Sequence, residues 1–372
     1  MVLTILVFIV MLSVLVLIHE LGHFLVAKKF GIKVEEFGFG FPPRVWGKKI
    51  GETLYSINLL PIGGFVKLFG EDEAGSGRIK PSVVSSQKSE VDEIHRAFFA
   101  RPIWQRALVV IAGVVMNFLL AVLIITYLFT FEGVPTPGNQ IVISEVVKSS
   151  PADLSGLKKN DLVLKINNID IHNTNALILE TRKRLGEKIN IQVRRGNEVK
   201  TIWVVPRKDY PKNQGPMGIA ISQNIEVRKY PFPQSLYYGT YQALNDSYLT
   251  VAGFKNVIID IFTRFTVPAG VAGPIGMAQL TGEFVKAGPL AVLSLMYVLS
   301  LSLAVLNILP IPALDGGRFF FILVEAVTRR KVNPRFEATA HAVGIALLLT
   351  FMALVSYKDI IRIISGQSIF PQ

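Results

Sequence analysis

Cysteine is absent from this chain of 372 residues, and charged residues are scarce, at 18% of the total. Without cysteine no disulfide can form, and any metal ion must be held by nitrogen and oxygen ligands. A hydrophobic fraction of 51% combined with so little charge exceeds what soluble domains usually show. The composition therefore predicts an integral membrane protein.

The N-terminus also lacks the marks of a secretory signal peptide. The apolar run from Val2 to Ala27 has neither a basic start nor a small-residue cleavage site, so we interpret it as a retained membrane span. The net charge of +12 does not indicate nucleic-acid binding, because the basic residues are scattered along the chain. We expect them at the membrane surface and expect no nucleic-acid partner.

This first apolar run contains the chain's most informative cluster, His19, Glu20 and His23. In a helix the two histidines lie one turn apart on the same face, which is the H-E-x-x-H arrangement of zinc sites. In such sites two imidazoles bind the metal and the glutamate handles a proton. The alternative is a chance match, or a helix in which the histidines are ordinary core residues. Ionisable groups are costly at membrane depth, so we favour a functional site.

The region after the first span changes from apolar runs to short β-like segments broken by glycine and proline. Between Gly31 and Gly70, polar and apolar residues alternate, and Gly63 and Gly64 complete a turn after Pro61. This pattern predicts a hairpin-like sheet that dips against the membrane. The alternative is a small structural sheet on the cytoplasmic face.

A second apolar run, which we predict to be a second membrane span, is followed by a segment with the composition of a soluble domain. Residues 150–168, in particular Ser150-Pro151-Ala152-Asp153 and the following Gly156-Leu157, closely resemble the core of a PDZ domain. The resemblance implies an inserted α+β domain that could bind an extended peptide or a C-terminus by strand addition. A plain spacer or steric plug is the alternative.

The predicted fold is a polytopic α-helical membrane protein with about four transmembrane helices, a membrane-associated β-hairpin sheet and one inserted α+β PDZ domain. Lys28 and Lys29, and later Arg329 and Arg330, mark cytoplasmic ends of spans, which leaves both termini outside. The predicted segments are a first span with the histidine motif at 1–27, a cytoplasmic-side β-hairpin region and flexible loop at 28–106, a second span at 107–131, an extracytoplasmic PDZ domain at 132–208, an extracytoplasmic amphipathic or linker region with a Gly/Pro loop at 209–288, a third span at 289–317, a cytoplasmic-side segment at 318–337, a fourth span at 338–357 and a tail at 358–372.

A catalytic zinc ion needs a third protein ligand beside two histidines, with one position left open. The remaining histidines, His95, His172 and His341, lie in the predicted loop, in the PDZ-like segment and near the start of the last span. Asp315 is the better supplier, because it follows the end of the third span at about the depth reached by His19. Its alternative role is to cap the helix that follows.

The residues around Asp315 form a second motif, Asn307-x-x-Pro310-x-Pro312-x-Leu314-Asp315-Gly316. Together with the histidine motif and the intervening PDZ-like segment, it resembles the site-2 protease family, the intramembrane zinc metalloproteases of the regulator-of-sigma-E-protease type. This resemblance implies one catalytic Zn²⁺ held by His19, His23 and Asp315, with Glu20 as the catalytic glutamate. The substrate-binding residues it implies are Asn307, Gly63, Gly64, Pro310 and Pro312.

The function expected from this resemblance is cleavage of transmembrane segments in single-span proteins, such as anti-sigma factors or signal-peptide remnants. The enzyme would lie in a bacterial cytoplasmic membrane among lipid, with its site in the cytoplasmic half and the PDZ domain outside, where it filters substrates. One alternative is a membrane-anchored PDZ scaffold whose metal site is structural or vestigial. Metal transport is disfavoured, because the ionisable residues cluster at one depth instead of forming a path.

Overall fold

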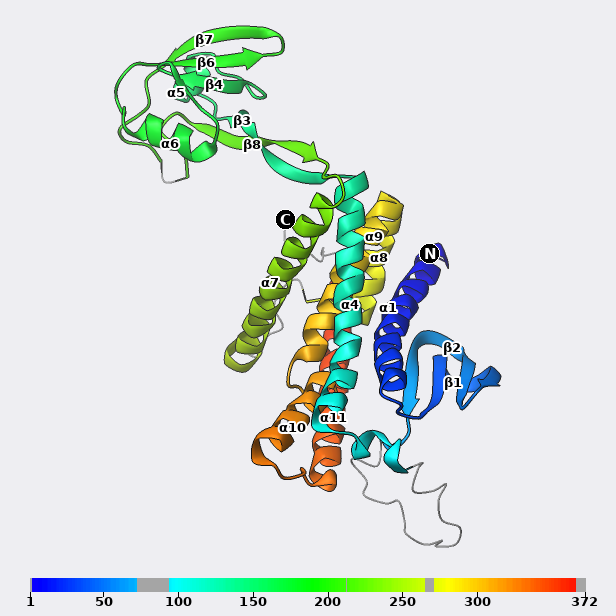
Figure 1. Ribbon diagram of the computed structural model, residues 1–372. Coiled ribbons are helices and arrows are strands. Elements are labelled where there is room, and N and C mark those ends of the chain that lie inside the picture. The colour runs from blue at the N-terminus through cyan, green and yellow to red at the C-terminus, as the bar shows by residue number, and fades with distance from the viewer. Residues whose placement is uncertain (1, 72–93, 212, 265–270, 366–372) are drawn as a thin grey trace, which may run out of the picture. The chain divides into compact units, whose positions relative to one another are not determined.

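The computed structural model describes residues 2–71, 94–211, 213–264 and 271–365 (Figure 1). Residues 72–93, within the predicted flexible loop, lie outside the described residues, and so do parts of the predicted Gly/Pro loop and tail. The chain forms two compact units. The membrane unit comprises Met1–Leu128 and Pro231–Gln372, and the inserted unit comprises Phe129–Tyr230.

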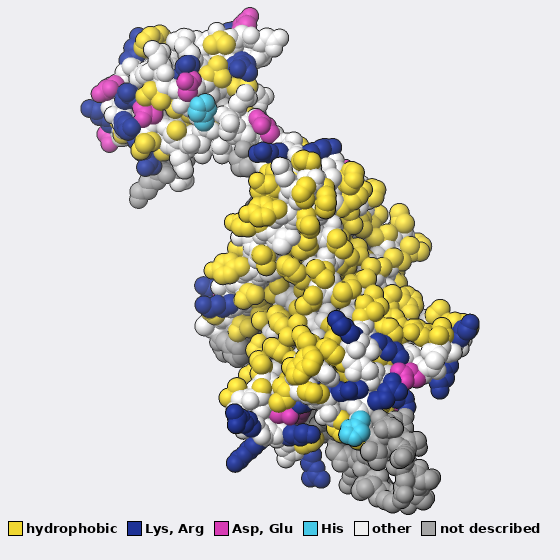
Figure 2. All heavy atoms as spheres, viewed as in Figure 1, with side chains coloured by type: hydrophobic (Ala, Val, Ile, Leu, Met, Phe, Trp, Pro, Cys, Tyr) yellow, Lys and Arg dark blue, Asp and Glu magenta, His cyan; other side chains and the backbone are white. Residues whose placement is uncertain are grey.

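Within the described residues, four helices of the membrane unit are long and apolar enough to cross a membrane, with mean hydropathies between 2.0 and 3.0. They are α1 (Val2–Lys29), α4 (Ile103–Phe131), α9 (Pro289–Ile308) and α11 (Pro334–Ile364). Much of their apolar surface is not covered by protein, and Figure 2 shows hydrophobic side chains over most of the visible face of this unit. Such a surface suits a lipid environment and not water. The predicted polytopic membrane protein is thus confirmed.

The segment predicted as an amphipathic or linker region, between the inserted unit and the third span, is largely helical. It contains one long helix, α7 (Gln234–Arg264), followed by α8 (Pro274–Ala287). The hydroxyl of Tyr297 on α9 donates a 2.7 Å hydrogen bond to the Asp246 carboxylate, so α7 packs along the spans. The sequence alone does not show that Asp246 on α7 has a hydrogen-bond partner on α9.

The sheet that follows α1 is more folded than a plain hairpin. Strands β1 (Val34–Ile50) and β2 (Thr53–Leu68) are antiparallel. Two different segments of β2 pair with the two edges of β1. Phe37 lies opposite Tyr55 on one side and opposite Val66 on the other. The first half of β1 is therefore central, and the last segment of β2 becomes an edge strand that packs against α1.

Below the histidines, a hydrophobic cluster joins α1, β1, α4 and α10 (Asp315–Thr328). Its most buried members include Ala27, Val34, Val109 and Ile322. This cluster ties together α1 and α10, which carry His19, His23 and Asp315, with α4 and β1, although these elements are far apart in the sequence.

The inserted unit is built on one antiparallel sheet in the order β7-β6-β4-β3-β8, with the short β5 paired to β4. Its elements are β3 (Val134–Val146), α5 (Pro151–Leu154), β4 (Leu162–Ile166), β5 (Ile169–Asp170), α6 (Thr174–Arg182), β6 (Ile189–Arg195), β7 (Glu198–Val204) and β8 (Ile219–Arg228). Strand β8 lies beyond the expected boundary at residue 208 and completes the sheet by pairing with β3. Burial alone would raise the pKa of Asp161 in this unit, but its ion pair with Arg195 lowers that pKa overall.

Candidate metal centre

Helix α1 brings His19 and His23 onto one face, as their spacing predicted. Both side chains are buried, and their Nε2 atoms lie 3.2 Å apart. Their rings meet edge to face, with centroids 4.8 Å apart. Two acceptor-capable nitrogens that face each other at this distance need a proton or a cation between them.

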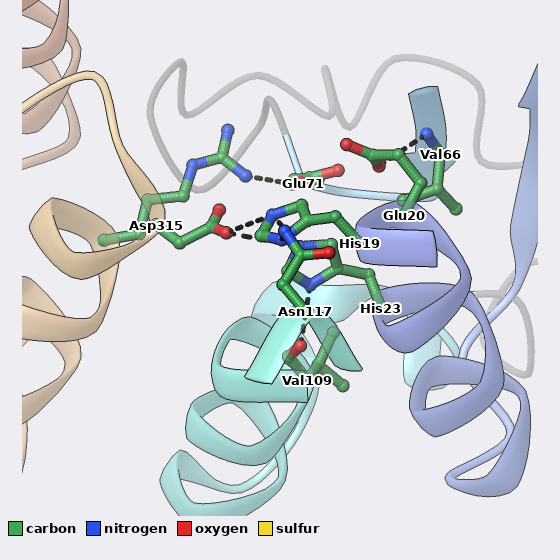
Figure 3. Close-up of polar contacts among 9 residues, drawn as sticks. His19, Glu20, His23, Val66, Glu71, Val109, Asn117 and Asp315 are labelled. Carbon is green, nitrogen blue, oxygen red and sulfur yellow. Dashed lines mark hydrogen bonds and ion pairs between the residues drawn. The ribbon is translucent and has the colours of Figure 1, made fainter. Parts of the chain in front are cut away.

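Asp315 reaches the same point from the first turn of α10, almost three hundred residues later. Its Oδ2 atom lies 2.8 Å from the Nε2 of His19 and 3.3 Å from the Nε2 of His23 (Figure 3). The turn after α9 ends in Leu314, whose extended backbone at the N-cap position aims Asp315 toward α1. The structure thus brings together the three residues that the two motifs predicted as ligands.

The spacing of these three atoms suits zinc. His19, His23 and Asp315 each offer one ligand atom, and all three atoms lie within 4.8 Å of one another. In a tetrahedral site with bonds of about 2.0–2.1 Å, ligand atoms lie roughly 3.3–3.4 Å apart. The observed separations of 2.8, 3.2 and 3.3 Å are close to that value. Two imidazoles and one carboxylate are also a usual donor set for catalytic zinc.

Helix α4 supports the two imidazoles from below. The Nδ1 of His23 lies 2.8 Å from the carbonyl oxygen of Val109, so Nδ1 carries the proton and Nε2 is left free to bind a metal. The amide of Asn117 lies 3.4 Å from the Nδ1 of His19, and its oxygen is buried without a partner among the described residues. If that amide is turned by 180°, its oxygen accepts the Nδ1 proton of His19 and fixes the same tautomer.

Sequence reasoning missed Gly113, which lets α4 pass beneath the site. A Cβ atom at this position would lie 2.4 Å from the Nε2 of His23 and 2.7 Å from the Cε1 of His19. Any side chain here would displace the imidazoles, so α4 can support them only through a glycine. Neither helical periodicity nor motif spacing indicates this close approach.

Glu20 belongs to the same helix but points toward the sheet. Its Oε2 atom accepts a 3.0 Å hydrogen bond from the backbone N–H of Val66 on β2 (Figure 3). Glu20 also lines a cavity of about 230 Å³ together with His19, Asn117 and Asp315. The carboxylate therefore borders the space beside the three ligand atoms without competing with them.

The remaining predicted residues are those that were expected to bind substrate, and they lie in different parts of the membrane unit. Asn307 lines the same cavity, from α9. Gly63, which has a φ of +87° within β2, and Gly64 lie next to Val16 and Leu17 of α1, just before the histidine motif.

Pro310 and Pro312 lie in the turn before Asp315 and, within the described part of the chain, are not among the residues that line the cavity. They shape the turn that presents Asp315. Arg318, also in the first turn of α10, forms an ion pair with Glu71 near the end of β2.

Two histidines of an H-E-x-x-H helix that meet a carboxylate are the mark of a zinc peptidase. Here the helix belongs to a polytopic membrane protein, so the class is a membrane-bound zinc metalloprotease. The sequence profile of peptidase family M50 matches residues 7–351, and the chain belongs to this family. The predicted site-2 protease family and the predicted zinc cofactor are thereby confirmed.

Several bacterial proteins resemble this chain over nearly its whole length. A Clostridium perfringens protein classed provisionally as a zinc metalloprotease is 35% identical over 350 residues, which cover 94% of this chain and 96% of that protein. The zinc metalloprotease RasP of Geobacillus kaustophilus is 28% identical, with 95% and 96% coverage. The regulator of sigma-W protease RasP of Bacillus subtilis is 26% identical, with 97% and 99% coverage. Because the chain belongs to a peptidase family, the alternative functions of a membrane-anchored scaffold and of a metal transporter are not supported.

Proposed function

We propose that this protein is an intramembrane protease that hydrolyses peptide bonds in the transmembrane segments of single-span membrane proteins. The depth of the site supports this most strongly, because His19, Glu20 and His23 lie inside the 28-residue apolar helix α1. Lys28 and Lys29 end that helix and mark its cytoplasmic side by the positive-inside rule. His19 is nine residues before Lys28, or about 14 Å along the axis, which supports a site in the cytoplasmic half of the membrane.

The chemistry assigns one role to each group around the cavity. His19, His23 and Asp315 would hold a zinc ion, and the chemistry this ion would supply is Lewis-acid polarisation of the scissile carbonyl and activation of water as a nucleophile. Glu20 accepts the proton of the attacking water and passes it to the leaving amide nitrogen. Asn307, which lines the same cavity from α9, has a side-chain amide that can hydrogen-bond the substrate backbone.

A helical substrate hides its carbonyls in backbone hydrogen bonds and must unwind before attack. The edge segment from Gly64 to Leu68 pairs with β1 on one side. On its other side the Val66 N–H faces Glu20, and Gly64 packs against Leu17. An extended substrate that pairs with this edge would regain its hydrogen bonds and lie beside Glu20.

The absence of cysteine allows a direct test of strand pairing. In a Lys67→Cys variant, whose side chain stands exposed on the edge segment, we expect a disulfide with a substrate that carries one cysteine near its cleavage site. A Lys49→Cys variant near the far end of β1 is the matched control and should not cross-link. The background variant Glu20→Gln keeps the substrate intact during the experiment, and non-reducing gels measure the product. Equal cross-linking at both positions would contradict pairing at the edge segment.

The inserted unit is proposed to filter substrates on the outer side of the membrane, as a PDZ-like domain. It contains a groove of about 340 Å³ between α6 and the edge strand β8, lined by apolar residues that include Leu177, Met217, Ile219 and Ile221. An edge strand beside a helix is the arrangement that binds extended peptides. A single-span protein trimmed on its outer side, such as an anti-sigma factor or a signal-peptide remnant, would present a new C-terminus of that kind. The resemblance to a protein named as a regulator of sigma-W fits this proposal.

Deleting the inserted unit should relax selectivity without removing activity. Its two ends are adjacent, because the N–H of Tyr230 donates a 3.1 Å hydrogen bond to the carbonyl of Phe129. A short glycine–serine turn can therefore replace residues 135–227. We expect this variant to cleave both an untrimmed and a trimmed model substrate at similar rates, where the intact protein prefers the trimmed one. Unchanged preference, measured by cleavage in liposomes, would count against filtering.

A further inference from the structure

The turn between α9 and α10 holds a strained residue just before Asp315. Ala313 has a φ of +90°, a region that residues other than glycine seldom occupy. Such a conformation persists only where the surroundings hold it. Because Ala313 precedes Asp315 by two residues, its backbone angles decide where the Asp315 carboxylate points.

The Ala313 N–H is held by a side chain from another helix. It donates a 3.0 Å hydrogen bond to the Nδ1 of His341 on α11. An Nδ1 atom that accepts must be unprotonated, so in the neutral ring the proton is on Nε2. The ring of His341 rests against Phe321 of α10, with centroids 5.8 Å apart, and this contact restricts its orientation.

The same face of α11 is shaped to the turn at a second position. Gly344 follows His341 by three residues and so lies on the same side of the helix. A Cβ atom at Gly344 would stand 2.3 Å from the carbonyl oxygen of Pro312. A glycine thus allows α11 to approach the turn closely enough for His341 to reach Ala313.

We propose that His341 is a positioning residue for the metal centre: its Nδ1 atom holds the Ala313 N–H and fixes the turn that aims Asp315 at His19 and His23. This inference rests on the proposed role of Asp315 as a zinc ligand. His341 is not among the three ligand residues or the residues that line the cavity within the described part of the chain, although its partner Ala313 does line it. It acts through the backbone and not through the metal.

Three substitutions separate the hydrogen bond from packing. His341→Leu removes the acceptor, whereas His341→Asn keeps one, because its Oδ1 is bonded to Cγ as Nδ1 is in histidine. His341→Gln carries its acceptor one bond further from the backbone. We expect the leucine and glutamine variants to bind zinc about 10–100-fold more weakly, in the range seen when supporting partners of metal ligands are lost. The asparagine variant should stay within about threefold of the unmodified protein.

Zinc affinity is measured on the purified full-length protein by competition with a chromogenic chelator. Hydrogen exchange of the zinc-free protein gives a second readout, because the Ala313 amide should exchange faster in the leucine and glutamine variants and not in the asparagine variant. In zinc-loaded protein, kcat should fall for those two variants while KM changes little. Val343→Ala, an exposed neighbour on α11, is the control and should match the unmodified protein.

Each result decides the proposal. Unchanged zinc affinity and amide exchange in His341→Leu would overturn it, and an asparagine variant as impaired as the leucine variant would leave His341 only a packing role. If the leucine variant does not fold, the asparagine and glutamine pair decides the same point. Asp315→Asn is measured alongside. If it retains zinc, the proposed ligand set fails; if it loses zinc while His341→Leu does not, only the positioning role fails.

Discussion

Replacing Glu20 by glutamine should reduce substrate cleavage by about 10²–10⁴-fold while zinc remains bound. Glutamine has nearly the same shape as glutamate, and Glu20 is not among the three converging ligand atoms, so the metal site should persist. What is lost is the group that accepts a proton from water. The amide of the substituted glutamine cannot take that proton, although the amide oxygen can still accept the hydrogen bond from the Val66 N–H.

The measurement uses a single-span model substrate in liposomes, with zinc content determined on the same preparation. Glu52→Gln is the matched control, because Glu52 sits near the turn of the sheet and pairs with Lys28 and Arg96 away from the cavity. That control should keep most of the activity. Cleavage by Glu20→Gln within about tenfold of the unmodified protein would remove Glu20 from its proposed role.

The sequence predicted most of the site because its signals are local. His19, Glu20 and His23 fall within five residues of one helix, and their polarity stands out in an apolar run. Asp315 was predicted by a different signal, a carboxylate beyond a proline-broken helix end at matching depth. The structure brings these residues to one point.

The contacts that support the site could not be predicted in this way, because they depend on which helices pass close to one another. Gly113 is one of thirty glycines in the chain, and nothing in its neighbourhood marks it as the residue beneath His23. His341 was considered only as a ligand and set aside. Its hydrogen bond to Ala313 joins residues twenty-eight positions apart, across a turn whose backbone the sequence does not specify.

Long-range strand pairing escaped prediction for a similar reason. The sequence of β1 does not indicate which of its two edges will be paired. That β2 pairs with both edges follows only from how the sheet packs on α1. Strand β8 ends in exposed residues such as Ile225 and Val227, and its pairing with β3 spans more than seventy positions. Alternation predicts that a strand exists, but not which strand lies beside it.

Removing the charge of Asp315 is expected to have the other large effect, on zinc binding itself. In Asp315→Asn the oxygen can still occupy its place 2.8 Å from His19, but a neutral amide replaces the anion. A cation held by two neutral imidazoles and an amide loses most of its electrostatic stabilisation in a buried site. We expect zinc affinity to fall by about 100-fold or more, and cleavage to fall with it.

The affinity is measured by chelator competition, with Asp260→Asn on α7 as the control, because Asp260 pairs only with a neighbouring Arg264 among the described residues. Tight zinc binding by Asp315→Asn would require another third ligand, and Glu20, which borders the same cavity, would become the first candidate. The two substitutions therefore test each other. Zinc kept without turnover in Glu20→Gln, together with zinc lost in Asp315→Asn, separates the residue that moves the proton from the residue that holds the metal.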